Sequence, residues 1–111
     1  MNMDVRQENS VTVISVEGEV DASNSIDLGD SLDQLLAEGH KKLVVDLGEV
    51  GFIDSSGLAT LIRVFKHARA DSGDVCLASL QPPVKRAFEL TRLDRVFVLH
   101  PDAATAVRGM A

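Results

Sequence analysis

The sequence predicts an α/β protein with one mixed, mostly parallel β-sheet of about four to five strands, packed by about four helices. The first observation behind this prediction is a regular alternation of strand-like and helix-like segments along the 111 residues. The second is the continuous apolar run KKLVVDL at 41–47, which is typical of a strand covered on both faces. The third is that no linker, internal repeat or low-complexity tract interrupts the chain, which predicts one domain over residues 1–111.

The first two elements are expected to be a strand and a helix. The segment SVTVISVEGEV at 10–20 is rich in β-branched residues and predicts a strand. In DASNSIDLGDSLDQLLAEGH at 21–40, the isoleucine and leucines fall mostly on one helical face, and Gly39 stands where a C-terminal cap belongs. Gly29 weakens this helix without breaking it. The candidate N-caps are Asp21, Ser23 and Ser25.

The remaining segments continue the alternation. GEVGFID at 48–54 predicts a turn and a brief strand-like segment, and a second helix follows it and ends at DSG. Apolar residues at spacings of three and four along that helix are expected to face the core. They are Leu58, Leu61, Ile62 and Phe65. The later elements are a strand DVCLASL at 74–80, a short helix QPPVKRAFELTRL at 81–93 with proline in its first turn, a strand DRVFVLH at 94–100 and a helix PDAATAVRGM at 101–110.

The charge of the chain is acidic and unevenly placed. A formal net charge of -6 argues against a nucleic-acid binder that is held by counterion release. Residues 1–54 carry 12 acids and 3 bases, whereas residues 55–111 carry 5 acids and 8 bases. Part of the surface is therefore expected to be acidic and to suit a partner with a basic face. The basic residues of the second half that stand out are Lys85, Arg86, Arg92 and Arg95, expected on a solvated face, with an anion or lipid-headgroup role as the alternative.

The sequence also indicates a compartment. Cys76 is the only cysteine, so no intrachain disulfide is expected, and its apolar surroundings predict a small buried side chain and not a reactive thiol. The polar N-terminus lacks the apolar core of a signal peptide. No apolar run approaches the roughly 18 residues of a membrane-spanning helix. A soluble cytoplasmic protein is the expectation.

The segment FIDSSGL joins a strand-like run to the second helix and places two hydroxyls after an acid. A helix start presents unpaired N–H groups and a partial positive charge, which would suit a phosphate on Ser55 or Ser56. Asp54 beside that phosphate would repel it, so the phosphorylated and unphosphorylated forms would differ strongly in local surface charge. Acids and serines before a helix are most often simply caps, and both roles can hold together. Gly57 is unusual in a first helical turn and is expected to leave room for the backbone of another molecule.

Three segments together resemble one family. GEVDASNS, VVDLGEVGFIDSSGL and PPVKRAFELTRLDRVF, in this order and at these separations, resemble the bacterial anti-sigma-factor antagonists, which have the STAS fold. The resemblance runs from about Met3 to Ala106, and FIDSSGL is its most specific part.

The resemblance implies a partner-switching regulator and not an enzyme. In that family a partner anti-sigma factor, a serine kinase of histidine-kinase-like fold that uses ATP, phosphorylates the serine that corresponds to Ser55. The unphosphorylated antagonist binds the anti-sigma factor and frees the sigma factor, and a serine phosphatase resets the phosphorylated form. The residues expected around the phosphosite and at the partner interface are Asp21, Ser23, Asp54, Ser56 and Gly57. No cofactor, metal ligand or catalytic residue is implied.

Three other functions would also fit parts of the sequence. A serine hydrolase needs a base, but no G-x-S-x-G elbow is present, and His40, His67 and His100 are expected at surface or edge positions. A phospho-aspartate receiver would use Asp46 at a strand end, although EGEVD places the paired acids poorly and no late strand ends in lysine. The third is a STAS regulatory or scaffold domain of another partner-switching or transport system. The intact DSSG segment argues against a domain that has lost phosphorylation.

Overall fold

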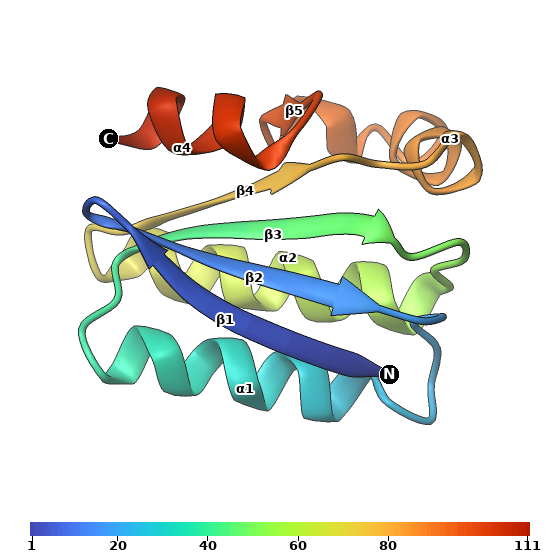
Figure 1. The fold of residues 1–111 in the computed structure, drawn as a ribbon. Helices are drawn as coiled ribbons and strands as arrows, with labels where there is room; N and C mark the ends of the chain where they lie inside the picture. The colour runs from blue at the N-terminus through green and yellow to red at the C-terminus, as the bar shows by residue number, and fades with distance from the viewer.

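The computed structural model describes residues 1–111 as one five-stranded sheet with helices on both faces (Figure 1). The strands are β1 (Asn2–Glu8), β2 (Val11–Glu17), β3 (Lys42–Glu49), β4 (Asp74–Ala78) and β5 (Leu99–His100). The helices are α1 (Ser25–Ala37), α2 (Ser55–Ala70), α3 (Pro82–Leu90) and α4 (Ala103–Met110), with a 3₁₀ helix η1 (Leu93–Arg95). The strands lie in chain order across the sheet; β1 is antiparallel to β2, and the other pairs are parallel. The predicted α/β class and mixed, mostly parallel sheet are confirmed.

Alternation along the strands divides the core between the two faces of the sheet. Ile14 and Val16 of β2 point toward α1 and α2, where they join the larger apolar cluster. Val11 and Val13 of the same strand belong to the smaller cluster under α4. Figure 1 shows the same division, with α1 and α2 on one side of the sheet and α4 on the other. Both faces of the central strands are therefore covered, as the apolar run at 41–47 predicts.

Strand β1 was not predicted. The segment Asn2–Glu8 has only two strongly apolar side chains, Met3 and Val5, because β1 is an edge strand that is largely exposed. A two-residue turn joins it to β2, since Glu8 pairs with Val11. Asn9 takes the left-handed conformation there with φ 59°, which asparagine tolerates better than most residues. A half-exposed strand with a polar turn leaves too weak an apolar pattern to find in the sequence.

The last strand is much shorter than the predicted segment 94–100. Arg92 adopts φ 63°, and the chain then forms η1. The Phe97 N–H bonds the Leu93 carbonyl at 2.9 Å, which turns the Phe97 ring into the core before β5 begins at Leu99. Burial of one aromatic ring has overridden the strand preference of the surrounding valines.

The buried face of α2 is rotated from the predicted one. Leu58 and Leu61 are buried as expected, but Ile62 and Phe65 are only half-buried, and Val64 is fully enclosed instead. The rotation arises because α2 packs against α1 as well as against the sheet, and Thr60 lies against Gly29 of α1. A side-chain carbon added at Gly29 would lie 2.9 Å from the Thr60 methyl group, so α1 contains this glycine where the helices approach closely.

The ends of α1 show one wrong prediction and one confirmed one. Asn24 is the N-cap residue, its side chain makes no capping bond, and the helix begins at Ser25, so none of Asp21, Ser23 and Ser25 is the N-cap. Gly39 is confirmed as the glycine that ends the helix, directly after the C-cap residue Glu38. It has φ +97°, and its N–H bonds the Leu36 carbonyl at 3.0 Å.

Two further predictions concern burial and length. Cys76 is buried as predicted, and desolvation raises the pKa of its thiol to about 12, which keeps it an unreactive apolar side chain. None of the helices combines the length and the apolar character that crossing a membrane requires.

Candidate functional site

The predicted site lies where the chain leaves β2 and β3. An isolated parallel bridge pairs Val20 with Ile53 beyond the ends of these strands. The Val20 N–H bonds the Phe52 carbonyl at 2.9 Å, and the Asp54 N–H bonds the Val20 carbonyl at 3.1 Å. Asp21 and Asp54 directly follow the two bridged residues, so the structure brings these two predicted acids to the same edge of the sheet.

Asp54 caps α2 as its N-cap residue. Its carboxylate Oδ1 accepts the N–H groups of Ser56 at 3.0 Å and Gly57 at 3.1 Å, and also the Ser56 hydroxyl. These bonds lower the pKa of Asp54 below 3.8, chiefly through the Ser56 hydroxyl and then through the Gly57 N–H. The N–H groups of Ser56 and Ala22 lower this pKa further, whereas desolvation raises it. Asp54 is therefore an ionised cap that also faces the loop after β2.

The two serines of the junction differ in what they do. The Ser56 hydroxyl is half-buried and donates to Asp54. Ser55 is exposed at the first position of α2, and its hydroxyl makes no hydrogen bond within the chain. Only the Ser55 hydroxyl is thus free to react with an incoming group without breaking an existing bond.

The N–H groups expected to meet a phosphate are largely occupied. Of the first four N–H groups of α2, those of Ser56 and Gly57 bond the Asp54 carboxylate, and that of Leu58 bonds the Asp54 carbonyl at 3.1 Å. Only the N–H of Ser55 itself makes no hydrogen bond within the chain. In the unphosphorylated protein Asp54 therefore occupies the N–H groups that the sequence offers to a phosphate, and only the Ser55 N–H is left unbonded.

The loop after β2 repeats the arrangement of an acid and a serine two residues later. Asp21 Oδ1 accepts the Ser23 N–H at 2.9 Å and also the Ser23 hydroxyl. The Asn24 side chain braces the loop, because its oxygen accepts the Asp21 N–H at 3.0 Å and its amide donates to the Glu19 carbonyl at 2.9 Å. Asp21 and Ser23 are thus held in a fixed turn beside the start of α2 and remain partly or fully exposed.

Gly57 has a different role from the predicted one. It is buried, and an added side-chain carbon would lie 2.7 Å from Ile53 Cγ1 and 2.8 Å from Val20 Cγ1. The space that glycine leaves is filled by the two bridged residues of the same chain, so the expected approach of another molecule's backbone is wrong. Glycine lets the first turn of α2 sit directly on the bridge.

Two exposed apolar residues near this edge were missed by sequence reasoning. Phe52 is 48% exposed two residues before Asp54, and Ile26 is 63% exposed in the first turn of α1. A signal for Phe52 was present, because neighbours in an extended segment point to opposite sides and Ile53 points into the core. Phe52 lies two residues before Asp54 and Ile26 five residues after Asp21, so exposed apolar side chains are available close in the chain to both acids.

The side chains of the rival functions are placed elsewhere. His67 lies twelve residues along α2 from Ser55, about 18 Å at the rise of an α-helix, and its ring bonds Asp33 at 2.9 Å. Asp46 is not at a strand end, since β3 continues to Glu49, and its carboxylate accepts the Gly48 N–H. No group of three or more histidine, cysteine or acidic side chains is arranged to hold a metal ion.

Comparison with known proteins assigns the family. Residues 2–106 match the STAS domain. The anti-sigma-F factor antagonist RsfB of Mycobacterium tuberculosis is 32% identical over 111 residues, which cover 95% of this chain and 88% of RsfB. An anti-sigma factor antagonist structure from Mycobacterium paratuberculosis is 28% identical with a TM-score of 0.89, over 98% of this chain and 92% of that one. Bacillus SpoIIAA in its phosphorylated form shares the fold, with 16% identity and a TM-score of 0.76 over 99% of this chain and 100% of SpoIIAA.

The chain therefore belongs to the STAS domain family, and the resemblance found in the sequence is confirmed. The relatives compared here are anti-sigma-factor antagonists, which are regulatory proteins and not enzymes.

The Asp54 cap predicts a pH-dependent contribution to stability. The pKa of Asp54 is lower in the folded protein than its usual value of 3.8. The ionised carboxylate therefore stabilises the fold at pH values above 3.8, and this stabilisation is lost as the pH falls through the pKa of the folded protein. Asp54→Ala should lower the thermal midpoint at pH 7, and the gap from wild type should close in strong acid. Asp30→Ala, which removes an exposed acid without a hydrogen bond, should change the midpoint little. A gap for Asp54→Ala that stays constant down to pH 2 would contradict this role.

Proposed function

We propose that this protein is an anti-sigma-factor antagonist that binds an anti-sigma factor when Ser55 is free and releases it when Ser55 is phosphorylated. The observation that carries the proposal is the pair of serines at the start of α2. The Ser56 hydroxyl is committed to Asp54, whereas the Ser55 hydroxyl is exposed and unbonded. The relationship to RsfB, whose name is anti-sigma-F factor antagonist, supports the same role.

The proposed binding surface consists of the side chains around Ser55. Phe52 and Ile26 supply exposed apolar area, and Asp21 and Asp54 supply negative charge beside it. A partner that covers this edge of the sheet would exclude water from Ser55 and meet an acidic surface, which favours a basic contact on its side. Asp21 and Ser23 are held by their own turn, so this part of the surface is already ordered before binding.

Phosphorylation would act on the partner surface more than on the fold. A phosphate adds a charge of about -1.5 to -2 next to the ionised Asp54. The Ser56 and Gly57 N–H groups are bonded to Asp54 and are not available to neutralise it. The added charge would therefore remain at the surface in the free protein, and covering it with a partner would cost its hydration.

The proposal includes the partners that this chemistry needs. The anti-sigma factor would itself be the serine kinase, of histidine-kinase-like fold, that transfers phosphate from ATP to Ser55, and a serine phosphatase would remove it. Sigma factors and ATP act in the cytoplasm, so the protein would work there. Residues 1–111 would act as one unit in this cycle.

The identity of the phosphosite provides the direct test. Incubation with ATP and a candidate anti-sigma kinase should place one phosphate on Ser55, as mapped by mass spectrometry. Ser55→Ala should abolish the label while keeping kinase binding. Ser56→Ala removes a hydroxyl that points to Asp54 and should leave the label on Ser55. Label on Ser56 alone would refute the assignment.

A further inference from the structure

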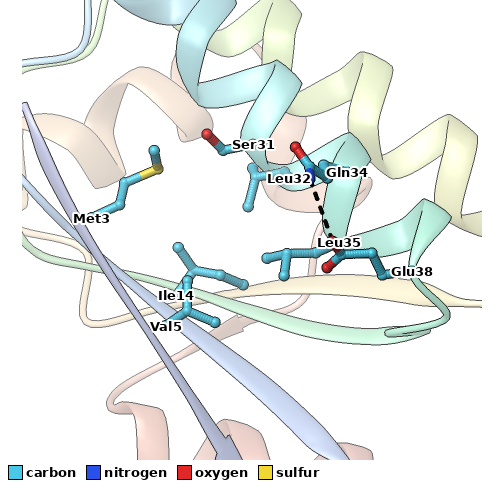
Figure 2. A pocket seen from close by; sticks show the side chains of 8 residues that line it. All are labelled: Met3, Val5, Ile14, Ser31, Leu32, Gln34, Leu35 and Glu38. Atoms are coloured by element: carbon cyan, nitrogen blue, oxygen red, sulfur yellow. Dashed lines mark hydrogen bonds between the residues drawn. The ribbon is translucent and has the colours of Figure 1, made fainter.

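A groove lies between the outermost strand β1 and helix α1 (Figure 2). Ser55 does not line this groove. Its volume is about 330 Å³. Its apolar lining consists of Met3, Val5, Ile14, Leu32 and Leu35. Polar side chains of α1 and of its C-cap residue Glu38 form the rim, and the Gln34 amide donates to the Glu38 carboxylate at 3.3 Å.

The groove exists because one strand has no helix beneath it. Ile14 of β2 and Leu32 of α1 are almost completely buried, so α1 covers β2. Val5 of β1 is paired with Ile14 and points to the same face, yet it is 48% exposed. In Figure 2 the side chains of Met3 and Val5 lie opposite the leucines of α1, with open space between them. The sheet thus has an apolar strip for which the chain supplies no cover.

The helix beside this strip is acidic on the side that faces it. The segment Ser25–Glu38 contains acids and no base. Asp33 is occupied on the other side, where it pairs with Arg63 at 3.8 Å and His67 at 2.9 Å of α2. Asp27 precedes the rim residues Ser31 and Gln34 by four and seven positions, so it lies on the same side of the helix as they do. Glu38 follows Gln34 by four positions and lies on this side too. No ion pair neutralises either Asp27 or Glu38.

These charges decide between the possible occupants. A second copy of the chain, joined through the free edge of β1, would continue the sheet and bring the two α1 helices together on one face. Both would present Asp27 and Glu38, and like charges brought together in a partly dry contact disfavour that arrangement. A partner with basic residues beside an apolar face meets the apolar strip and the acids at once.

We propose that the groove docks a basic amphipathic helix of a partner protein, laid under β1 alongside α1. Its apolar side chains would fill the space over Val5 and Leu35, and its lysines or arginines would face Asp27 and Glu38. The helix would continue the layer that α2 and α1 form and would cover the exposed strip. The apolar lining of the groove is separate from the Ser55 site, since it uses β1, β2 and the second half of α1; only Asp27 of its charged rim lies in the first turn of α1.

The test uses a defined probe. A designed helical peptide of about 18 residues, with leucine on one face and lysine on the other, is titrated against the whole protein by fluorescence anisotropy. A second peptide keeps the leucines and replaces lysine by glutamate. The matched protein variants are Val5→Lys in the groove and Val98→Lys at another exposed valine, which is 59% exposed. Methyl NMR spectra record which side chains the peptide contacts.

We expect the lysine peptide to bind, to shift the methyl signals of Val5, Ile14 and Leu35, and to bind at least about tenfold more tightly than the glutamate peptide. Val5→Lys should weaken the lysine peptide at least about tenfold, because it places an unpaired ammonium in the apolar groove. Val98→Lys and Ser55→Asp should leave this affinity unchanged. The Ser55→Asp result keeps the inference independent of the proposed switch.

Any of four results would overturn the proposal. One is equal binding of the two peptides. The second is that the shifted signals lie outside the groove, and the third is that Val5→Lys does not change the affinity. The fourth is a dimer in sedimentation experiments that Val5→Lys disperses, since this would assign the groove to a second copy of the chain.

Discussion

Ser55→Asp is expected to weaken binding to the anti-sigma kinase by about a hundredfold while leaving the thermal midpoint of the free protein nearly unchanged. Ser55 is exposed and its hydroxyl makes no bond, so the fold loses nothing when it is replaced. In the complex, the partner's basic contacts would already be paired with Asp21 and Asp54. The new carboxylate would therefore be removed from water without a partner, and a cost of about 2.8 kcal/mol is enough for this loss of affinity.

Isothermal calorimetry with one kinase preparation separates charge from shape at this position. Ser55→Ala should bind as tightly as the wild type, because it removes only a free hydroxyl. Ser55→Asn, which has the size of aspartate without its charge, should bind more tightly than Ser55→Asp. If wild type, Ser55→Ala and Ser55→Asp bind equally well, Ser55 lies outside the interface and the proposed switch has no mechanism.

Phe88→Ala should lower the free energy of unfolding by about 3–5 kcal/mol, the range for a large aromatic side chain removed from a core. Phe88 is fully buried in the larger apolar cluster, and its ring meets that of Phe97 edge to face at 5.9 Å. The loss is large against a stability of roughly 5–15 kcal/mol for a domain. Urea unfolding followed by circular dichroism measures it.

Phe65→Ala is the matched comparison. The sequence places Phe65 in the core, where its loss would cost as much as that of Phe88. In the structure it is half-buried at the edge of the cluster, 5.0 Å from the Phe97 ring and with Arg69 over its face at 5.8 Å. Its truncation should therefore cost clearly less than that of Phe88. Equal costs for the two variants would contradict the burial seen here.

The central part of the fold was predictable because its signals are local and strong. The apolar run at 41–47, the spacing of leucines in α1 and α2, and Gly39 as a cap each follow from a short stretch of chain. Strand β1 was not predictable in this way, since only pairing with β2 makes its polar residues a strand. The shortening of the last strand depends on where Phe97 finds space in the core, which no local pattern records.

The candidate site was predictable in its members but not in their arrangement. The motif FIDSSGL indicates Asp54, Ser55 and Ser56 together, yet it cannot show that one carboxylate oxygen binds Ser56 and leaves Ser55 free. The role of Gly57 depends on Val20, which is 37 positions earlier in the chain and reaches it only through the bridge to Ile53. Contacts between distant segments are what the sequence alone leaves undetermined.

The Asp54 carboxylate affects how a phosphate on Ser55 would be recognised by a partner and removed by a phosphatase. The Asp54 carboxylate already accepts two N–H groups of the first turn of α2. A phosphate could take its place only by removing the N-cap of the helix. A phosphate on Ser55 would thus be kept outside the protein's own hydrogen-bond network and remain accessible to a phosphatase. The free protein would keep the same conformation with and without the phosphate. The two forms would then differ to a partner in surface charge and not in conformation.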